Sequence, residues 1–249
     1  MEVKVLASGS KGNCVWIGNG EVSILIDAGL PKTKIEKIML ERDIDPSKID
    51  GIFITHEHGD HVMGLSLADK YKIPVFASEG TLKAVDRIDS GKIMRVGNFH
   101  GFDALRLSYM IVSPFNVHHD AMEPFAFTVT TRDKKATVLM DTGQVDEAML
   151  EAMRYSDYYV FECNHDIDML QDGDYDARTK ARVLSDIGHL SNDAAAEALA
   201  KLVTGKGEHI WLTHMSSNNN LPALAEGTVK RALWAKGLLP GKHYSLEVF

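Results

Sequence analysis

Three histidines and an aspartate within residues 56–61 constrain the fold of this chain more than any other feature. They follow residues 51–55, a short β-branched and aromatic run that is typical of a buried strand. Imidazole nitrogens suit zinc and neighbouring first-row ions, and a carboxylate adds a hard oxygen ligand. A solvated histidine-rich loop is the alternative, but four potential ligands in six residues favour a metal site. The fold must therefore bring further ligands to the end of this strand.

Three later apolar runs also end in histidines or acids. Residues 105–112 are followed by His118 and His119, residues 136–140 by Asp141, and residues 208–213 by His214. Ligands in open α/β sheets gather at the carboxyl ends of strands. We therefore expect these strand ends, although distant in sequence, to meet in one crevice with residues 56–61.

Together these residues resemble the metallo-β-lactamase superfamily. The signature His-x-His-x-Asp-His and the later isolated His, Asp and His are matched by His56, His58, Asp60, His61, His119, Asp141 and His214. Residues 24–29 match an early strand ending in Asp-x-Gly, which makes Asp27 a carboxylate that orients the metal loop. The resemblance implies an α/β fold, the αββα four-layer sandwich of two mixed β-sheets, with residues 1–249 as a single hydrolase domain. Periodicity alone indicates only mixed α/β.

A narrower resemblance is to the bacterial YycJ (WalJ) group of 5′ to 3′ DNA exonucleases. It rests on residues 6–13, 119–121, 162–166, 188–192 and 214–219. In that group a His-Asp-Ala step is the third metal motif, which favours His119 over the adjacent His118 as the ligand. The doubled histidine leaves a register ambiguity of one residue, and Met215 stands where the group more often has an aliphatic residue.

The resemblance implies two divalent metal ions, zinc or manganese. It assigns His56, His58 and His119 to the first ion, Asp60, His61 and His214 to the second, and Asp141 to a bridge between them. Ligand count supports a pair, because seven protein ligands exceed what one tetrahedral ion accepts. Two ions about 3.5–4 Å apart can share a bridging hydroxide and hold the attacking and leaving oxygens of an in-line displacement. Imidazoles favour zinc while carboxylates admit manganese, so ligand type does not choose between them.

His189 is the second candidate catalytic residue beside Asp60, and neither metal shell requires it. It lies between a helix expected to end near residue 185 and an alanine-rich helix from residue 192, with Ser191 or Asn192 as N-cap. Phosphodiesterase branches of the superfamily such as tRNase Z carry a similar Gly-His element that protonates the leaving oxygen. An imidazole suits a general acid near neutral pH. The alternative role is a capping or core histidine at a helix junction.

Seven further side chains near these motifs are candidate substrate contacts. The small residues of the loop 8–13 can present N–H groups to a phosphate, although such loops are often plain hairpin connections. Uncharged donors beside His214 suit phosphate or sugar oxygens. The candidates are Ser8, Ser10, Asn13, Asn164, His165, Ser216 and Asn219.

The hydrophobic pattern predicts strands and helices in mixed order. The expected strands are 2–7, 14–18, 22–26, 51–54, 93–96, 104–112, 125–131, 136–140, 157–162, 208–213 and 243–248. Those between 93 and 140 are expected to form a largely antiparallel group. One helix is expected to begin at Pro31, and the others to span 62–71, 79–86, 146–153, 176–185, 192–203 and 222–236.

Composition fits one enzyme domain without a membrane anchor. Of the 249 residues, 45% are hydrophobic, which suffices for a sizeable core. No apolar run approaches the ~18–20 residues that a transmembrane helix needs, and the chain opens on a strand, not on a signal sequence. The cysteines, Cys14 and Cys163, lack Cys-x-x-Cys spacing, which favours a reducing cytoplasm. Cys163 lies close to the candidate site, so a ligand role for it stays open. A homo-oligomer is also left open.

The formal net charge of −8 opposes the basic footprint of nucleic-acid-binding proteins. Metal ions would add positive charge locally, and Lys11, Arg178, Lys180 and Arg182 are candidates for a phosphate-binding rim. We interpret the chain as a dinuclear metal phosphodiesterase, a 5′ to 3′ exonuclease acting on DNA ends. One alternative is a hydrolase of the same fold that acts on small cyclic phosphodiesters, RNA, lactams or thioesters. The other is a non-catalytic metal-binding regulator.

Overall fold

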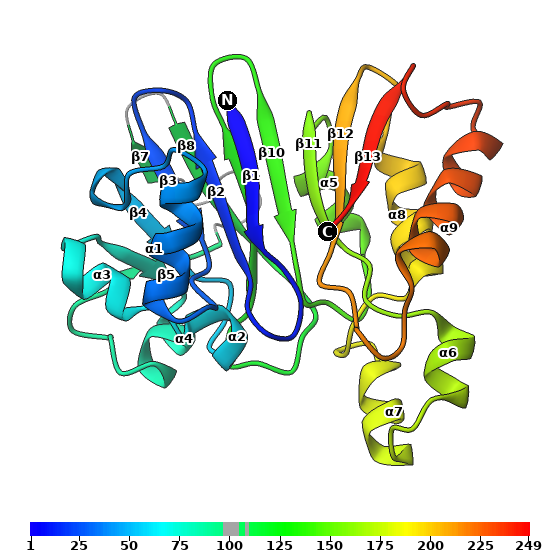
Figure 1. The fold of residues 1–249 in the computed structure, drawn as a ribbon, viewed down its shortest axis with the longest axis horizontal. Coiled ribbons are helices and arrows are strands. Elements are labelled where there is room, and N and C mark those ends of the chain that lie inside the picture. The colour runs from blue at the N-terminus through cyan, green and yellow to red at the C-terminus, as the bar shows by residue number, and fades with distance from the viewer. Residues whose placement is uncertain (97–104, 108–109) are drawn as a thin grey trace. The chain divides into compact units, whose positions relative to one another are not determined.

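The computed structural model describes residues 1–96, 105–107 and 110–249, and these divide into two units (Figure 1). The first comprises Met1–Asn116 and Ala121–Asp133, and the second comprises Val117–Asp120 and Lys134–Phe249. Both units combine strands with helices. The single domain that the sequence predicts over residues 1–249 stays a prediction.

The first unit contains a six-stranded sheet whose strands follow their order in the chain. They are β1 (Glu2–Ala7), β2 (Cys14–Gly18), β3 (Ser23–Ile26), β4 (Gly51–Phe53), β5 (Val75–Ala77) and β6 (Lys92–Ile93). Strands β1 to β3 pair antiparallel, whereas β3 to β6 pair parallel. Because β3 and β4 are parallel, their carboxyl ends lie at one edge. That edge carries Asp27 after β3, and Thr55 and His56 after β4.

The helices of the first unit bury apolar side chains against this sheet. They are α1 (Lys32–Glu41), α2 (Gly59–Val62), α3 (Ser66–Tyr71) and α4 (Glu79–Ala84), with a 3-10 turn at Pro46–Lys48. Helix α1 follows Pro31, and its Ile35 and Met39, one turn apart, lie in the same core as Leu25 and Ile52 of β3 and β4. Each fully buried aliphatic side chain contributes roughly 1.5–3 kcal/mol relative to an exposed one. The edge that holds the histidine loop therefore rests on a well-packed core.

Two details of the predicted order are wrong in the first unit. The expected helix 62–71 is interrupted between α2 and α3, because the Gly64 N–H donates to the Ala28 carbonyl at 2.7 Å. The expected strand 93–96 does not join the antiparallel group, since β6 pairs parallel with β5. The antiparallel ladder consists of β7 (Leu105–Leu107), β8 (Met110–Asn116) and β9 (Phe125–Thr130). Residues 104, 108 and 109 of the expected strand 104–112 lie outside the described residues.

The second unit is built on parallel strands. They are β10 (Lys135–Leu139), β11 (Tyr158–Glu162), β12 (Glu208–Thr213) and β13 (Tyr244–Val248). Strand β10 pairs parallel with β11. The helices are α5 (Glu147–Met153), α6 (Ile167–Asp172), α7 (Ala177–Val183), α8 (Asn192–Leu202) and α9 (Pro222–Ala235). Helix α8 packs against α5 and α9, and α9 contacts β13 (Figure 1). Helix α6 is not among the helices expected from the sequence.

The parallel direction of β10, β11 and β12 places Asp141, Glu162 and His214 at the same edge of their sheet. Asp141 and His214, like Asp27 in the first unit, adopt positive φ values of 53°, 54° and 62° respectively. Non-glycine residues rarely occupy this left-handed region, and the conformation costs on the order of 1–3 kcal/mol each. The surrounding structure therefore holds these three side chains in directions that a relaxed strand would not give them.

Gly29 permits a close backbone approach in the first unit. A Cβ added there would lie 1.6 Å from the backbone oxygen of Asp60 and 2.5 Å from the Asn13 nitrogen. We expect Gly29→Ala to displace the histidine loop and to lower the free energy of unfolding by at least the ~1–3 kcal/mol typical of overpacking. The control is Gly227→Ala in α9, where an added Cβ meets nothing within 4 Å and should stabilise by about 0.5–1 kcal/mol. Denaturant unfolding measures both, and unchanged stability of Gly29→Ala would contradict this account.

Candidate active site

The carboxylate of Asp27 organises the histidine loop of the first unit. Its Oδ2 lies 2.7 Å from His61 Nδ1, and its Oδ1 accepts the Thr55 N–H at 2.8 Å. The Thr55 hydroxyl donates to Asp27 Oδ2 at 2.9 Å and lies 3.0 Å from His56 Nδ1. Asp27, Thr55 and His61 are fully buried. A carboxylate or hydroxyl partner at Nδ1 fixes the ring so that Nε2 is the ligand nitrogen, an arrangement typical of metal-binding histidines.

The spacing of the loop histidines fits a metal ion. His56 Nε2 and His58 Nδ1 lie 3.0 Å apart, and their rings are nearly perpendicular. Two imidazoles on one tetrahedral zinc, with Zn–N bonds of about 2.0–2.1 Å, would place their nitrogens about 3.3 Å apart. Asp60 Oδ2 lies 3.5 Å from His61 Nε2, so the second half of the loop also presents an oxygen beside a nitrogen.

Asn13 connects the loop 8–13 to the histidine loop. Its Nδ2 lies 3.1 Å from His61 Nε2 and 3.3 Å from Asp60 Oδ2, while its Oδ1 accepts the Gly9 N–H at 2.9 Å. Its backbone N–H also donates to the Asp60 carbonyl. Because Asn13 is fully buried, these bonds give it a positioning role, and a direct substrate contact stays a prediction for it.

In the second unit, Asp141, Glu162, His189 and His214 form a cluster of potential ligands whose atoms lie within 4.8 Å of one another. His214 Nδ1 lies 2.6 Å from Asp141 Oδ1 and 3.1 Å from Glu162 Oε1. His189 Nδ1 lies 2.8 Å from Glu162 Oε1 and 3.2 Å from Asp141 Oδ1. Three of the expected site residues therefore meet within this unit, around a carboxylate that was not among the candidates.

Glu162 is a candidate functional residue that was not expected from the sequence. Its Oε1 faces His189 and His214, and its Oε2 accepts the Thr142 N–H at 2.9 Å and the Leu190 N–H at 3.3 Å. The signal was present, because Glu162 ends an apolar strand just as Asp141 and His214 follow theirs. Burial alone would raise the pKa of Glu162, but the neighbouring histidines hold it below its ordinary value.

The adjacent histidines at 118 and 119 face different surroundings within the second unit. His119 is buried, its Nδ1 lies 3.1 Å from the Gly188 carbonyl oxygen, and its ring lies 5.2 Å from that of His189. His118 is more exposed and its Nε2 pairs with Asp146 at 2.8 Å. Burial lowers the pKa of His119, which favours the neutral imidazole that a metal requires. These positions support His119 as the ligand.

The pKa of His189 is shifted in the opposite direction to that of His119. Burial by itself would lower its pKa, but the carboxylates of Glu162 and Asp141 outweigh that effect and raise the pKa to about 9. Its side chain remains 14% exposed, unlike the buried Glu162. The ring is therefore held at Nδ1 while part of it reaches the surface of the second unit.

The remaining substrate candidates fall into two groups. Ser8 is half-buried and Ser10 is exposed on the loop of the first unit. In the second unit Asn164, His165, Ser216 and Asn219 are buried. Asn164 Nδ2 donates to the His214 carbonyl at 2.8 Å, and the Ser216 hydroxyl accepts the Asn219 N–H at 3.2 Å, so both support the loop after β12. Burial lowers the pKa of His165 to about 4 and keeps it neutral. Substrate contact by these residues stays a prediction.

Local contacts bear on the expected phosphate-binding rim and on the ligand role left open for Cys163. Arg182 forms a two-pronged ion pair with Asp120, at 2.5 and 2.8 Å, and Lys180 Nζ donates to the Gln171 carbonyl at 2.7 Å. These two members of the expected phosphate rim therefore have structural partners. Burial raises the pKa of both the Cys14 and Cys163 thiols, which makes either a poor source of metal-binding thiolate.

None of the helices in the described part of the chain combines the length and the apolarity needed to cross a membrane.

Comparison with known proteins identifies the family. A model of the beta-lactamase superfamily domain matches residues 23–215. Exodeoxyribonuclease YycJ of Bacillus anthracis is 36% identical over 99% of this chain and 94% of its own length. Exodeoxyribonuclease WalJ of Streptococcus pneumoniae serotype 2 is 36% identical over 92% of this chain and 87% of its own. The solved metallo-beta-lactamase fold protein YhfI of Bacillus subtilis has a TM-score of 0.76 at 13% identity, covering 99% of this chain and 95% of that one.

These matches confirm the fold class expected from the sequence, two mixed β-sheets flanked by helices, and they define a hydrolase of the metallo-β-lactamase fold. The clusters of histidine and carboxylate described above are able to bind metal ions, as that class requires. The chain belongs to the metallo-β-lactamase superfamily and, within it, to the group of the YycJ and WalJ proteins.

The buried carboxylate behind the histidine loop should control metal affinity. Asp27→Asn keeps the shape of the side chain but removes the charge that faces His61 Nδ1. We expect zinc and manganese to bind about 10–100-fold more weakly, the range typical of such partners. Calorimetric titration of the metal-free protein measures this change. Asp50→Asn, which alters the acceptor of the Ser23 N–H at the other end of β3, is the control and should bind metal normally.

The His189–Glu162 contact predicts a pH dependence of the metal-free protein. Glu162→Gln removes the largest attraction while burial and the charge of Asp141 remain, so the pKa of His189 should fall below about 9. A raised folded-state pKa stabilises the protein below pH 6.5, and this stabilisation is lost as pH rises through about 9. NMR titration of labelled histidines measures the change. Glu247→Gln beside His209 is the control, and an unmoved His189 in Glu162→Gln would contradict the contact.

Proposed function

We propose that this protein is a dinuclear metal-dependent phosphodiesterase that digests DNA from its ends in the 5′ to 3′ direction. The observation that carries the proposal is the 36% identity, over nearly the whole chain, to two proteins named exodeoxyribonucleases. The metal-binding character of the histidine and carboxylate sets in each unit supports it. DNA as the substrate, the polarity of digestion and a cytoplasmic location remain part of this proposal, and a homo-oligomer stays open.

We assign the metal ligands according to the superfamily's motif. His56, His58 and His119 would hold one ion, Asp60, His61 and His214 the other, and Asp141 would bridge them. When bound, the two ions, zinc or manganese, supply Lewis acidity toward the phosphoryl oxygens and an activated water. Asp27 and Thr55 keep the Nδ1 atoms of His61 and His56 engaged, so that the Nε2 atoms are available as ligands.

His189 is assigned to protonate the leaving oxygen. Glu162 holds its Nδ1 at 2.8 Å, so the proton available for transfer is the one on Nε2. Two backbone amides hold the carboxylate of Glu162 in place. The His189 ring that bonds to this carboxylate is therefore held in one orientation. Such positioning favours general acid catalysis because the donor atom is held before substrate arrives.

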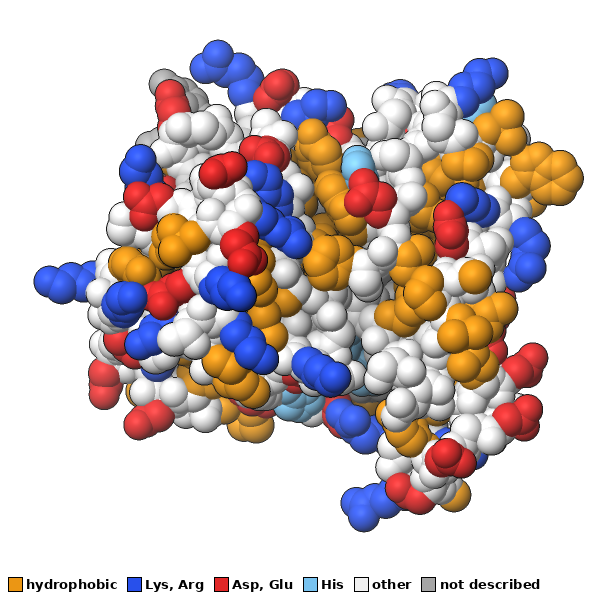
Figure 2. Space-filling model, viewed as in Figure 1, with side chains coloured by type: hydrophobic (Ala, Val, Ile, Leu, Met, Phe, Trp, Pro, Cys, Tyr) orange, Lys and Arg blue, Asp and Glu red, His pale blue; other side chains and the backbone are white. Residues whose placement is uncertain are grey.

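The charge distribution fits an enzyme that holds a strand end through few contacts. Figure 2 shows Lys and Arg side chains interspersed with Asp and Glu on the face drawn, consistent with a formal net charge of −8. Binding should therefore be weak, salt-sensitive and independent of base sequence, because phosphate contacts carry no sequence information.

A substrate panel tests the proposal. Metal-loaded protein is incubated with 5′-phosphorylated duplex and single-stranded DNA, RNA, a cyclic dinucleotide and a lactam. We expect release of nucleotides from the 5′ end of labelled DNA and little turnover of the others. Preferred turnover of RNA, cyclic diester or lactam would replace the proposed substrate within the same fold. Absence of any hydrolysis by protein with two bound ions would instead favour a non-catalytic metal-binding regulator.

His189→Ala and Asp60→Ala should separate acid catalysis from metal binding. His189→Ala is expected to keep its metal content and to lose about 10²–10⁴-fold in kcat, the usual contribution of a general acid. Asp60→Ala should lose both metal and turnover, as expected for a ligand. Metal analysis and steady-state kinetics measure the two effects. Loss of metal in His189→Ala would move this residue into the metal shell.

A further inference from the structure

A groove in the first unit begins at residues that touch the histidine loop. The cavity has a volume of about 510 Å³ and is lined by α4, by residues 95–96 after β6, by the end of β8 and by residues 122–125. The last of these segments is bonded to the histidine loop, because Met122 N–H donates to Glu57 Oε1 at 2.8 Å and Phe125 N–H donates to the Thr55 carbonyl at 2.9 Å. The groove therefore lies beside the histidine loop.

The groove presents two cations that share one carboxylate. Lys83 Nζ lies 2.5 Å from Glu79 Oε1, and Arg95 Nη2 lies 3.7 Å from Glu79 Oε2. These side chains are 42–66% exposed, so their ion pairs contribute little and can exchange for another anion. The other acid of the lining, Glu123, accepts the Gly80 N–H at 2.8 Å. The lining therefore carries two cations and two carboxylates; because the cations share Glu79 while Glu123 is bonded to the backbone, Lys83 and Arg95 are the groups that can exchange toward a phosphate.

The groove also presents apolar surface to a ligand. Met122 is 71% exposed, although it lies one residue before the anchored Glu123. Glycine at position 80 allows this segment to approach α4, since a Cβ there would lie 2.9 Å from the Glu123 Cβ. An exposed methionine offers a flexible apolar contact beside the two cations.

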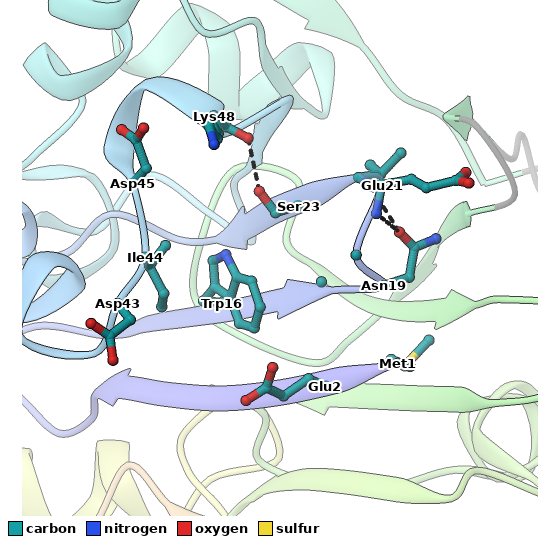
Figure 3. A pocket seen from close by; sticks show the side chains of 13 residues that line it. Met1, Glu2, Trp16, Asn19, Glu21, Ser23, Asp43, Ile44, Asp45 and Lys48 are labelled. Carbon is teal, nitrogen blue, oxygen red and sulfur yellow. Dashed lines mark hydrogen bonds between the residues drawn. The ribbon is translucent and has the colours of Figure 1, made fainter.

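A second cavity of the first unit is lined mainly by acidic side chains. It measures about 480 Å³ and includes Trp16, the carboxylates of Glu2, Glu21, Asp43 and Asp45, and one basic side chain, Lys48 (Figure 3). It includes Ser23 at the start of β3, whereas Asp27 and the histidine loop follow the other end of that strand. Both its charge and its position oppose a role in holding a phosphate chain.

We propose that the groove between α4 and residues 122–125 holds the nucleotide chain next to the scissile phosphate, with Lys83 and Arg95 as phosphate contacts. This inference rests on the proposed function and adds the surface that retains the strand. Glu79 competes with the phosphates for the same two cations. Removing the cations and removing their competitor should therefore change DNA binding in opposite directions.

The test compares Lys83→Ala/Arg95→Ala, Glu79→Gln and the matched control Lys37→Ala/Arg231→Ala. Lys37 also pairs with a glutamate one helical turn away, and Arg231 is exposed on α9. Binding of a 5′-phosphorylated phosphorothioate single strand is measured by fluorescence anisotropy over a salt series. KM and kcat are measured on the unmodified strand, and bis(p-nitrophenyl) phosphate reports on the metal centre alone.

We expect the groove double variant to raise KM about tenfold with little change in kcat. Its slope of log K against log salt should be shallower by about 1.4, since each single-strand phosphate contact contributes about 0.7. Glu79→Gln should bind about 1.5- to 5-fold more tightly, the range that an exposed ion pair allows. The control should match wild type, and all variants should hydrolyse the small diester normally.

Three results would overturn the inference. An unchanged salt slope in the groove variant would exclude the two phosphate contacts while leaving the proposed nuclease intact. Equal losses on DNA and on the small diester would show that the groove residues act through the fold. Wild-type protein that hydrolyses the diester but neither binds nor digests DNA would overturn the proposed function together with the groove.

Discussion

The buried contact between Asp27 and His61 is the interaction on which the histidine loop depends. A carboxylate removed from water is costly unless its oxygens are satisfied, and here they are satisfied by the Thr55 amide and hydroxyl and by His61 Nδ1. The same bonds fix the orientation of the rings. The requirement to satisfy a buried charge and the requirement to present ligand nitrogens are therefore met by one set of contacts, which explains why this carboxylate lies behind the loop.

In the second unit, Glu162 is the buried carboxylate whose oxygens must be satisfied and which orients neighbouring histidines. This carboxylate is fully buried, and two backbone amides and two histidines surround it. Asp141 and His214 lie beside it in strained left-handed conformations, so the ends of β10 and β12 turn their side chains toward β11. Backbone strain at such positions is maintained by the packed parallel strands, in which Val138, Phe161 and Leu212 are fully buried. A rigid sheet thus supports a cluster that could not form on a free loop.

Much of the organisation was predictable from local pattern. Strands ending in His56, Asp141 and His214 were recognised because β-branched apolar runs followed by a ligand are visible in sequence, and α8 was recognised from its alanine-rich period and serine cap. The pairing of β6 with β5 was not visible, because a strand of two residues has no periodicity of its own. The break between α2 and α3 was also missed, since it depends on a hydrogen bond from Gly64 to the distant Ala28.

The sequence by itself indicated the family, the fold class that the family implies and the candidate ligands, because the spacing of histidines and acids after apolar strands is a local property. Tertiary structure decided which distant residues form hydrogen bonds with these candidate ligands. It brought Asp27 to His61 across 34 positions, Glu162 to His214 across 52, and Asn13 to Asp60 across 47. It also turned His118 and His119 toward different partners. Such long-range pairings arise only when strands and helices pack, so no pattern of neighbouring residues specifies them.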